Sequence, residues 1–282
     1  MQKVLSFIFA ISVLIACNLE QEIELNLPDY EERVVVEAYL EAGKPYQILL
    51  TRSSSYFDAF PTDLAETFQQ LLVNDAQVSI SYQGNTIELD NFPTIDPATS
   101  KVYNYTSSQI IPFDTLNAFS LNITLSNGET ISGESTFLPP IPIDSIVTEF
   151  REETSGIDSA RVLTYFSDKI EEDNYFRRTL YVYRNGELEA LQDFTADDRF
   201  VEDIVVFGTA YEFTAGDTVI NRVYHIEEPY YRFLTSLEAA IAANGNPFGQ
   251  PSPIVPAVYG TANALGVFTC LSYAEEVTIL SE

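Results

Sequence analysis

Arg33-Val-Val-Val-Glu-Ala-Tyr-Leu40 and Tyr46-Gln-Ile-Leu-Leu-Thr-Arg52 form the stretch that decides the fold. Both runs are rich in β-branched and aliphatic residues, and Ala42-Gly-Lys-Pro45 between them is a typical turn sequence. Just upstream, apolar and polar residues alternate from Ile23 to Leu27, which is the period of a strand buried on one face. The stretch therefore predicts a hairpin of β-sandwich strands.

The same pattern continues as far as a proline-rich joint. Further strand-like runs, each bounded by Gly, Asn or Ser, occur at residues 76–82, 86–89, 119–125 and 130–137. Short strands with a turn about every ten residues are typical of an immunoglobulin-like β-sandwich. Leu138-Pro-Pro-Ile-Pro-Ile143 is stiff and extended, because Pro fixes its own backbone and restricts the residue before it. We therefore predict a sandwich at 22–139 and a domain boundary after it.

The second half, residues 140–282, is again mainly β. Strands are expected at 144–150, 161–167, 175–183, 218–226 and 266–280, and Asn185-Gly186 is a strong hairpin signal. A helix is expected at 229–244, because Pro229 suits a first helical position and apolar residues then recur at spacings of three and four. The overall prediction is a mainly-β chain, with a second β-sandwich or barrel-like domain carrying one helix in its C-terminal region.

The N-terminus has the features of a lipoprotein signal peptide. Lys3 precedes an apolar run from Val4 to Ile15 that is too short to cross a bilayer as a helix. Leu14-Ile-Ala-Cys17 matches a bacterial lipobox, so we expect a signal peptide at 1–16, acylation of Cys17 with chains such as palmitate, and a lipidated tether at 17–21. The alternative is an ordinary cleaved signal in which Cys17 is an incidental thiol.

Composition and charge exclude several classes of protein. With 46% apolar and 13% aromatic residues, the chain has enough material for folded cores. The formal charge of −28 would repel nucleic acid and anionic headgroups, so we expect no nucleic-acid partner, and the acyl chains are expected to be the membrane contact. The remaining cysteine, Cys270, lies in an apolar run and is expected to be a buried, inert thiol.

The sequence offers little for catalysis, a metal or another cofactor. His225 is the sole histidine and lies in an alternating run, where a structural role is favoured over membership of a catalytic triad. One histidine also removes the usual zinc ligand sets. Acidic pairs such as Glu152-Glu153 and Glu275-Glu276 are typical of solvated turns, although paired carboxylates can hydrolyse glycosides, and Glu171 to Asn174 leaves hard-cation binding as a minor alternative. We expect a protein that is not an enzyme, with no metal and no cofactor.

Aromatic residues are the better indication of a binding surface. Tyr56, Phe57, Tyr230, Tyr231 and Phe248 fall at expected loops or element ends, where tyrosine and phenylalanine provide rigid contact area for a glycan, a peptide or a partner protein. These five are the candidate ligand- or partner-binding residues. The alternative is that they complete the cores.

Several short motifs, spread over the mature chain, resemble one family. They are Tyr39-Leu40, Tyr46 to Ser54, Glu172 to Phe176, Gly216 to Val219, Tyr230-Tyr231, Asn246-Pro-Phe-Gly-Gln-Pro251 and Gly266-Val-Phe-Thr269. Together they resemble the domain of unknown function 4249 family of Bacteroidetes-type outer-membrane lipoproteins. That resemblance implies an outer-membrane lipoprotein encoded beside a TonB-dependent transporter, and it carries over no catalytic residue.

The expected function is that of a surface-exposed, lipid-anchored binding protein that assists a TonB-dependent nutrient transporter. Glu20 and Glu22 after the lipidated cysteine resemble a surface-export signal, so the protein is expected to face the cell exterior. Two alternatives stay open: a structural surface protein or adhesin, and a surface hydrolase.

Overall fold

The computed structural model describes residues 31–54, 69–96, 99–152, 158–167, 173–199, 203–243 and 252–281. Internal contacts divide the chain into two units, Met1–Glu31 and Glu32–Glu282, and all of the sheets belong to the second unit. The predicted signal peptide, Cys17 and the tether lie outside the described residues, as do Tyr56, Phe57 and Phe248. No helix among the described residues is long and apolar enough to cross a membrane.

The stretch at 33–52 forms the predicted hairpin. β1 (Val34–Glu41) and β2 (Pro45–Arg52) pair antiparallel, and buried residues alternate along both strands. The turn between them contains Gly43 with a φ of 82°, a conformation that glycine adopts without a steric penalty. The alternation read from the sequence is thus the alternation of core-facing and outward-facing side chains.

The strands of the N-terminal half surround one large hydrophobic core. Besides β1 and β2 they are β3 (Gln77–Tyr82), β4 (Asn85–Ile95), β5 (Val102–Ile110), β6 (Phe119–Thr124) and β7 (Thr130–Ser135). The short β14 (Tyr259–Gly260), from the C-terminal half, pairs with β7 and completes the order β1-β2-β5-β4-β3-β6-β7-β14. Ile48, Ile80, Phe119 and Phe137 meet in this core. β5 was not predicted, although it supplies the buried Tyr105, whose hydroxyl accepts a hydrogen bond from Ala76 N.

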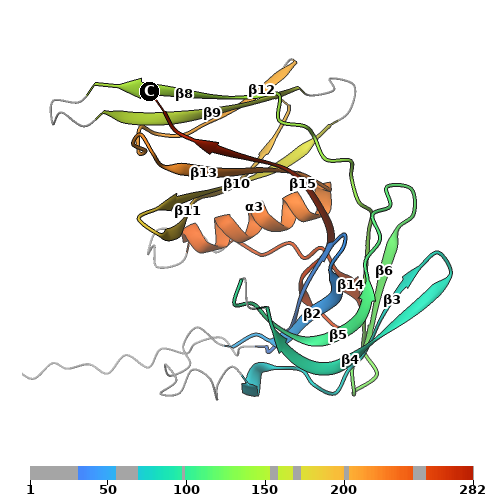
Figure 1. Ribbon diagram of the computed structural model, residues 1–282. Coiled ribbons are helices and arrows are strands. Elements are labelled where there is room, and N and C mark those ends of the chain that lie inside the picture. Colours follow the sequence, from blue (N-terminus) through green and yellow to red (C-terminus); the bar gives the residue numbers. More distant parts are fainter. Residues whose placement is uncertain are drawn as a thin grey trace, which may run out of the picture. The chain divides into compact units, whose positions relative to one another are not determined.

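Two sheets and a helix make three layers in the C-terminal half (Figure 1). One sheet contains β8 (Ser145–Arg151), β9 (Ser159–Ser167) and β12 (Ile204–Gly208). The facing strands are β10 (Tyr175–Arg184), β11 (Glu187–Asp197), β13 (Thr218–Ile226) and β15 (Leu265–Ile279). Helix α3 (Glu228–Ala243) packs on the other side of these four strands, where Tyr230 and Phe233 join Tyr224 and Leu271 in a separate core.

The long strand β15 belongs to both groups of strands. Its residues 265–271 pair in parallel with β1, and residues 272–279 pair antiparallel with β13. Gly266 allows this arrangement, since a Cβ there would lie 1.9 Å from Val36 O. Cys270 lies in the part of β15 that pairs with β1, and burial raises the pKa of its thiol to about 12, in agreement with the predicted buried thiol.

Arg178 on β10 is an unexpected charge in the C-terminal sandwich, where its side chain is fully buried. Its guanidinium donates to Asn221 Oδ1 at 2.8 Å, to Gln192 Oε1 at 2.7 Å and to Thr164 Oγ1 at 3.3 Å, all of them neutral acceptors. Burial lowers its pKa to about 10. Neutral side chains on three different strands therefore solvate a cation that the alternating sequence pattern did not reveal.

The mainly-β, sandwich-like fold predicted from the sequence is confirmed. The predicted helix at 229–244 corresponds to α3, and Asn185-Gly186 forms the two-residue turn between β10 and β11, with both residues at positive φ. The domain boundary after residue 139 stays a prediction, because β15 takes part in both groups of strands.

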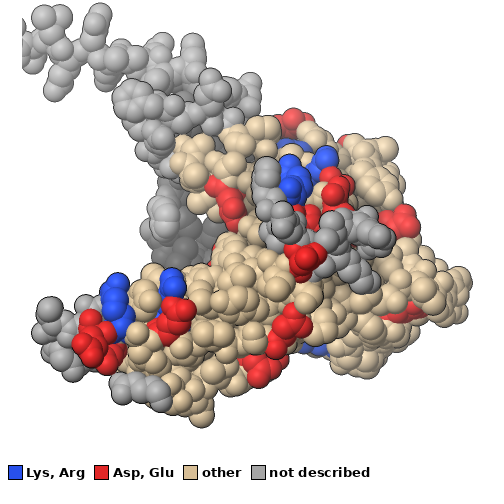
Figure 2. Space-filling model, turned by 90° about the horizontal axis from the view of Figure 1, so that it is seen from above, with Lys and Arg blue, Asp and Glu red and all other residues tan. Residues whose placement is uncertain are grey.

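Acidic side chains are spread over the surface. On the face shown in Figure 2, Asp and Glu occur in small groups, several of them beside Lys or Arg, with broad uncharged areas between them. The acidic side chains visible on that face therefore do not form a single acidic patch there.

Candidate binding site

A pocket of about 420 Å³ lies where β10 begins, β13 ends and α3 starts. These three elements and the segment after β7 supply its lining residues, which are Leu138, Asp173, Asn174, Tyr175, His225, Ile226, Glu227, Glu228 and Pro229. The register brings them together, because Tyr175 pairs with Ile226 and Phe176 pairs with His225. The pocket is therefore built from residues that are far apart in the sequence.

His225 holds one wall of the pocket. Its Nδ1 lies 3.0 Å from Pro139 O, and since a carbonyl oxygen only accepts, Nδ1 carries a proton and donates. Nε2 lies 3.1 Å from the side-chain amide of Asn174, and the ring stacks on Phe176 with 6.2 Å between centroids. Both ring nitrogens thus hold backbone or side chains in place, which agrees with the structural role favoured from the sequence.

Glu227 holds the segment between β7 and β8. Its carboxylate accepts a short hydrogen bond from Ser135 Oγ and another from Thr136 N at 3.2 Å. Burial raises the pKa of Glu227 despite these two donors. Ser135 Oγ also accepts from Cys270 N at 2.7 Å, so the carboxylate is connected to β15 through a single hydroxyl.

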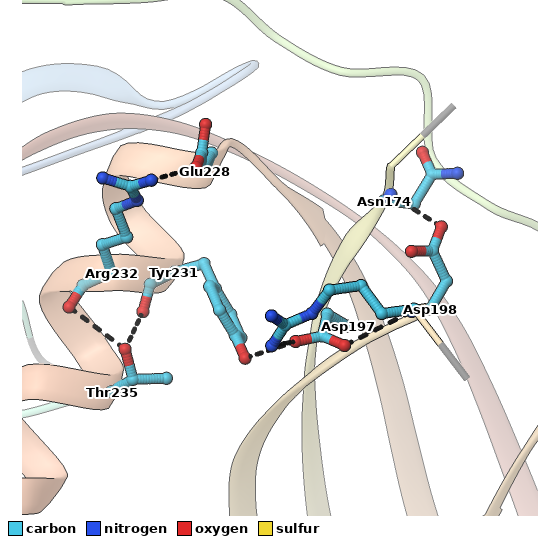
Figure 3. Close-up of polar contacts among 8 residues, drawn as sticks. Asn174, Asp197, Asp198, Glu228, Tyr231, Arg232 and Thr235 are labelled. Atoms are coloured by element: carbon cyan, nitrogen blue, oxygen red, sulfur yellow. Dashed lines mark hydrogen bonds and ion pairs between the residues drawn. The ribbon is translucent and has the colours of Figure 1, made fainter. Parts of the chain in front are cut away.

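A polar network around Tyr231 borders the pocket (Figure 3). The Tyr231 hydroxyl donates to Asp197 Oδ2 at 2.8 Å, and Arg199 forms an ion pair with the same carboxylate at 2.5 Å. The ion pair with Arg199 lowers the pKa of Asp197. The Tyr231 ring packs on Tyr175, with 4.8 Å between the ring centroids. Because Tyr175 lines the pocket, the network holds one side of the pocket in place.

A second pair of contacts fixes the two chain segments that carry this network. Asn174 N donates to Asp198 Oδ2 at 2.7 Å, which ties the start of β10 to the end of β11. On α3, Arg232 and Glu228 form an ion pair at 2.7 Å, and Thr235 Oγ1 donates to Tyr231 O at 3.0 Å. In Figure 3, Tyr231 reaches from the helix to Asp197, whereas the contacts of Arg232 and Thr235 stay within the helix.

The structure separates the two adjacent tyrosines of the predicted surface. Tyr230 is 1% exposed, accepts a hydrogen bond from Arg177 Nη1 at 2.8 Å and packs edge-on against Tyr39. Tyr230 is therefore a core residue, which corrects its assignment as a contact residue. Tyr231 is half-buried beside the pocket and keeps a side available for contact. The other candidates, Tyr56, Phe57 and Phe248, lie outside the described residues.

Most of the lining residues were not singled out from the sequence. Asn174 falls in the stretch considered for hard-cation binding and in one of the family motifs, whereas in Glu227-Glu228-Pro229 only the proline supports a prediction, that of the helix start. A usable signal existed in each case: a polar cluster directly before a strand, and a carboxylate pair directly before a helix. What the sequence did not contain was the register that places the two clusters side by side.

The side chains that line the pocket offer mainly hydrogen-bond acceptors. Carboxylates of Asp173 and Glu228 and the Tyr175 ring line it, so it suits a small polar or cationic ligand. Among the described residues, no group of three or more His, Cys, Asp or Glu side chains is placed to hold a metal ion.

The fold and the pocket define a mainly-β, sandwich-like protein with one helix beside a polar pocket. The chain belongs to the family described as domain of unknown function (DUF4249), whose model matches residues 20–276. A comparison with curated proteins finds no match. Among solved structures, a chain from a "Cytokine receptor complex" is 9% identical with a TM-score of 0.23, covering 70% of this chain and 86% of that one. At that score the likeness carries no argument about fold or function.

Proposed function

We propose that this protein is a lipid-anchored outer-membrane binding protein that assists a TonB-dependent nutrient transporter and is not an enzyme. The observation that supports binding over catalysis is that the two titratable side chains His225 and Glu227 at the pocket are already engaged in hydrogen bonds within the protein. His225 and Glu227 already hold Pro139, Asn174, Ser135 and Thr136, which supports a fixed receptor wall over an acid–base pair. A surface hydrolase would need catalytic side chains other than His225 and Glu227.

The anchoring part rests on the sequence. Leu14-Ile-Ala-Cys17 after an apolar run supports acylation at Cys17, and more than one acyl chain makes anchoring stable. Glu20 and Glu22 support export to the cell exterior. An anchored protein is confined to the same membrane as the transporter, which raises its effective concentration near the transporter. A small contact surface would therefore be sufficient.

One experiment in cells tests anchoring and partnership together. The tagged full chain is labelled with an alkyne analogue of palmitate, cross-linked in intact cells, extracted in mild detergent and purified with whatever accompanies it. We expect acyl labelling, membrane fractionation and co-purification of a TonB-dependent transporter. The Cys17→Ala variant should lose all three, whereas Cys270→Ala, which removes the only other cysteine, should keep labelling and membrane fractionation.

The possible outcomes separate the alternatives. Retained acyl labelling of the Cys17→Ala variant would contradict the lipobox. If the labelled protein is recovered without a transporter from cells that express the TonB-dependent transporter encoded beside it, the result would contradict the accessory role and favour an adhesin. Protection of the protein from protease added to intact cells, with cleavage after permeabilisation, would contradict the outward orientation.

A further inference from the structure

Among the described residues, nothing covers an apolar area on the four strands β10, β11, β13 and β15. The area, called here the uncovered face, consists of Tyr181, Tyr183, Leu188, Ile220, Val277 and Ile279. Register places them together: Tyr181, Ile220 and Val277 form one cross-strand row, while Leu188, Tyr183 and Ile279 belong to the next. Exposed fractions are 49% for Tyr183, 57% for Leu188, 54% for Val277 and 68% for Ile279, so this is a contiguous exposed patch.

Helix α3 covers the same side of the sheet but reaches other rows. The helix contacts the cross-strand row of Arg177 and Tyr224, where the Tyr230 hydroxyl accepts a hydrogen bond from Arg177. The core beneath the helix also includes Leu271 and the partly buried Tyr273. Arg222 marks the border, because it forms an ion pair with Glu275 at 2.5 Å and lies over the rings of Tyr181 and Tyr273. Beyond Arg222, Tyr181 and Ile220 are half-buried, and the other four residues of the uncovered face are exposed.

The uncovered face ends at an open strand edge. β1 pairs with β15 only as far as Leu271, and within the described part of the chain no strand replaces it beside residues 272–279. Leu280 N donates to Asp217 O, so Leu280 and every second residue before it in β15 direct their N–H and C=O groups toward β13. In an antiparallel ladder alternate residues point their N–H and C=O groups to opposite sides, so Tyr273, Glu275, Val277 and Ile279 direct theirs toward the open edge.

The charges at this edge select the occupant. Glu275 and Glu276 lie on the open part of β15, and the whole chain has a formal charge of −28. A second copy pairing through the same edge would bring these carboxylates together between two strongly acidic chains, which is unfavourable. A segment with Lys or Arg alternating with apolar residues would place its apolar side chains beside Val277 and Ile279. Its cations would then lie on the opposite face, which is the face of Glu276, while Glu275 stays paired with Arg222.

We propose that the open edge of β15 and the uncovered face bind an extended, basic segment of another protein, which adds a strand to the sheet. Backbone hydrogen bonds to residues 273–279 would provide affinity, and the apolar rows would select the alternating pattern. This inference concerns a surface apart from the pocket and stands whether or not the partner is a transporter.

A labelled synthetic peptide, acetyl-Lys-Val-Lys-Ile-Lys-Val-Lys-amide, is the probe, and fluorescence anisotropy at physiological ionic strength measures its binding to the purified protein. We expect saturable binding, with hydrogen exchange slowed within residues 273–279. Val277→Pro removes one outward N–H without breaking the ladder to β13 and should weaken binding at least about tenfold. Val277→Lys, which places a charge on the edge, should do the same.

Leu116→Lys is the matched control, because Leu116 is exposed in the segment between β5 and β6 and is not part of the uncovered face, so the substitution adds the same charge outside that face. It should change binding less than about twofold, the size of a general electrostatic effect. Unchanged thermal melts show that the variants fold. Equal weakening by Leu116→Lys, equally tight binding of a peptide with Glu in place of Lys, or no slowed exchange at 273–279 would each contradict the proposal. A concentration-dependent dimer that Val277→Lys abolishes would assign the edge to a second copy.

Discussion

At the scale of single residues, Glu227 makes the stability of the fold depend on pH. Burial raises its pKa in the folded state, so between its unfolded value near 4.5 and that raised value the folded chain binds more protons than the unfolded chain. Its contribution is fully present below about pH 4.5 and is lost as pH rises through the folded pKa, by at most about 1.4 kcal/mol per pH unit.

The Glu227→Gln variant should lack this loss, because its amide does not titrate. Urea unfolding of both proteins across a series of pH values should give a wild-type minus variant difference that becomes less favourable as pH rises. Ser135→Ala removes a donor that lowers the Glu227 pKa, so the loss should extend to higher pH in that variant. A difference that does not vary with pH would contradict this account.

At the scale of elements, the parallel pairing of β1 with β15 depends on Gly266. A Cβ at this position would meet Val36 O at 1.9 Å and Val36 N at 2.7 Å, and the φ of 108° is one that other residues rarely adopt. We therefore expect Gly266→Ala to reduce the free energy of unfolding by more than about 3 kcal/mol, measured by urea denaturation. Gly43→Ala is the control, since Gly43 has a φ of 82° but nothing within 4 Å, and should cost only about 1–2 kcal/mol. Equal costs would show that the steric contact with β1 is not decisive.

At the scale of the whole molecule, β15 couples the two groups of strands. Because one strand is hydrogen-bonded to β1 along its first part and to β13 along its second, we expect residues 32–282 to unfold in a single transition. Calorimetry should give equal calorimetric and van't Hoff enthalpies. Ile48→Ala in the N-terminal core and Val223→Ala in the C-terminal sandwich should each lower the midpoint of that same transition. Two transitions, each shifted by only one substitution, would instead support two independent domains divided after residue 139.

Patterns among residues that are close in the sequence predict individual strands, turns and the helix. Alternation over 33–52 specified β1 and β2, Asn185-Gly186 specified the turn of the β10–β11 hairpin, and a spacing of three and four from Pro229 specified α3. Period and turn chemistry depend on residues that are close in sequence, which is why these predictions are confirmed.

Strand pairing and the covering of sheet faces depend on contacts between residues far apart in the sequence. The pairing of Val36 with Gly266 joins residues that no local pattern connects, and it creates both the continuous sheet and the open edge beyond Leu271. Tyr230 and Tyr231 are adjacent and chemically identical, yet the helix turns one into the core and the other toward Asp197. The pocket likewise exists because register sets Tyr175 against Ile226. Burial depends on the neighbour that a folded sheet or helix presents, and that neighbour is selected by packing over the whole chain.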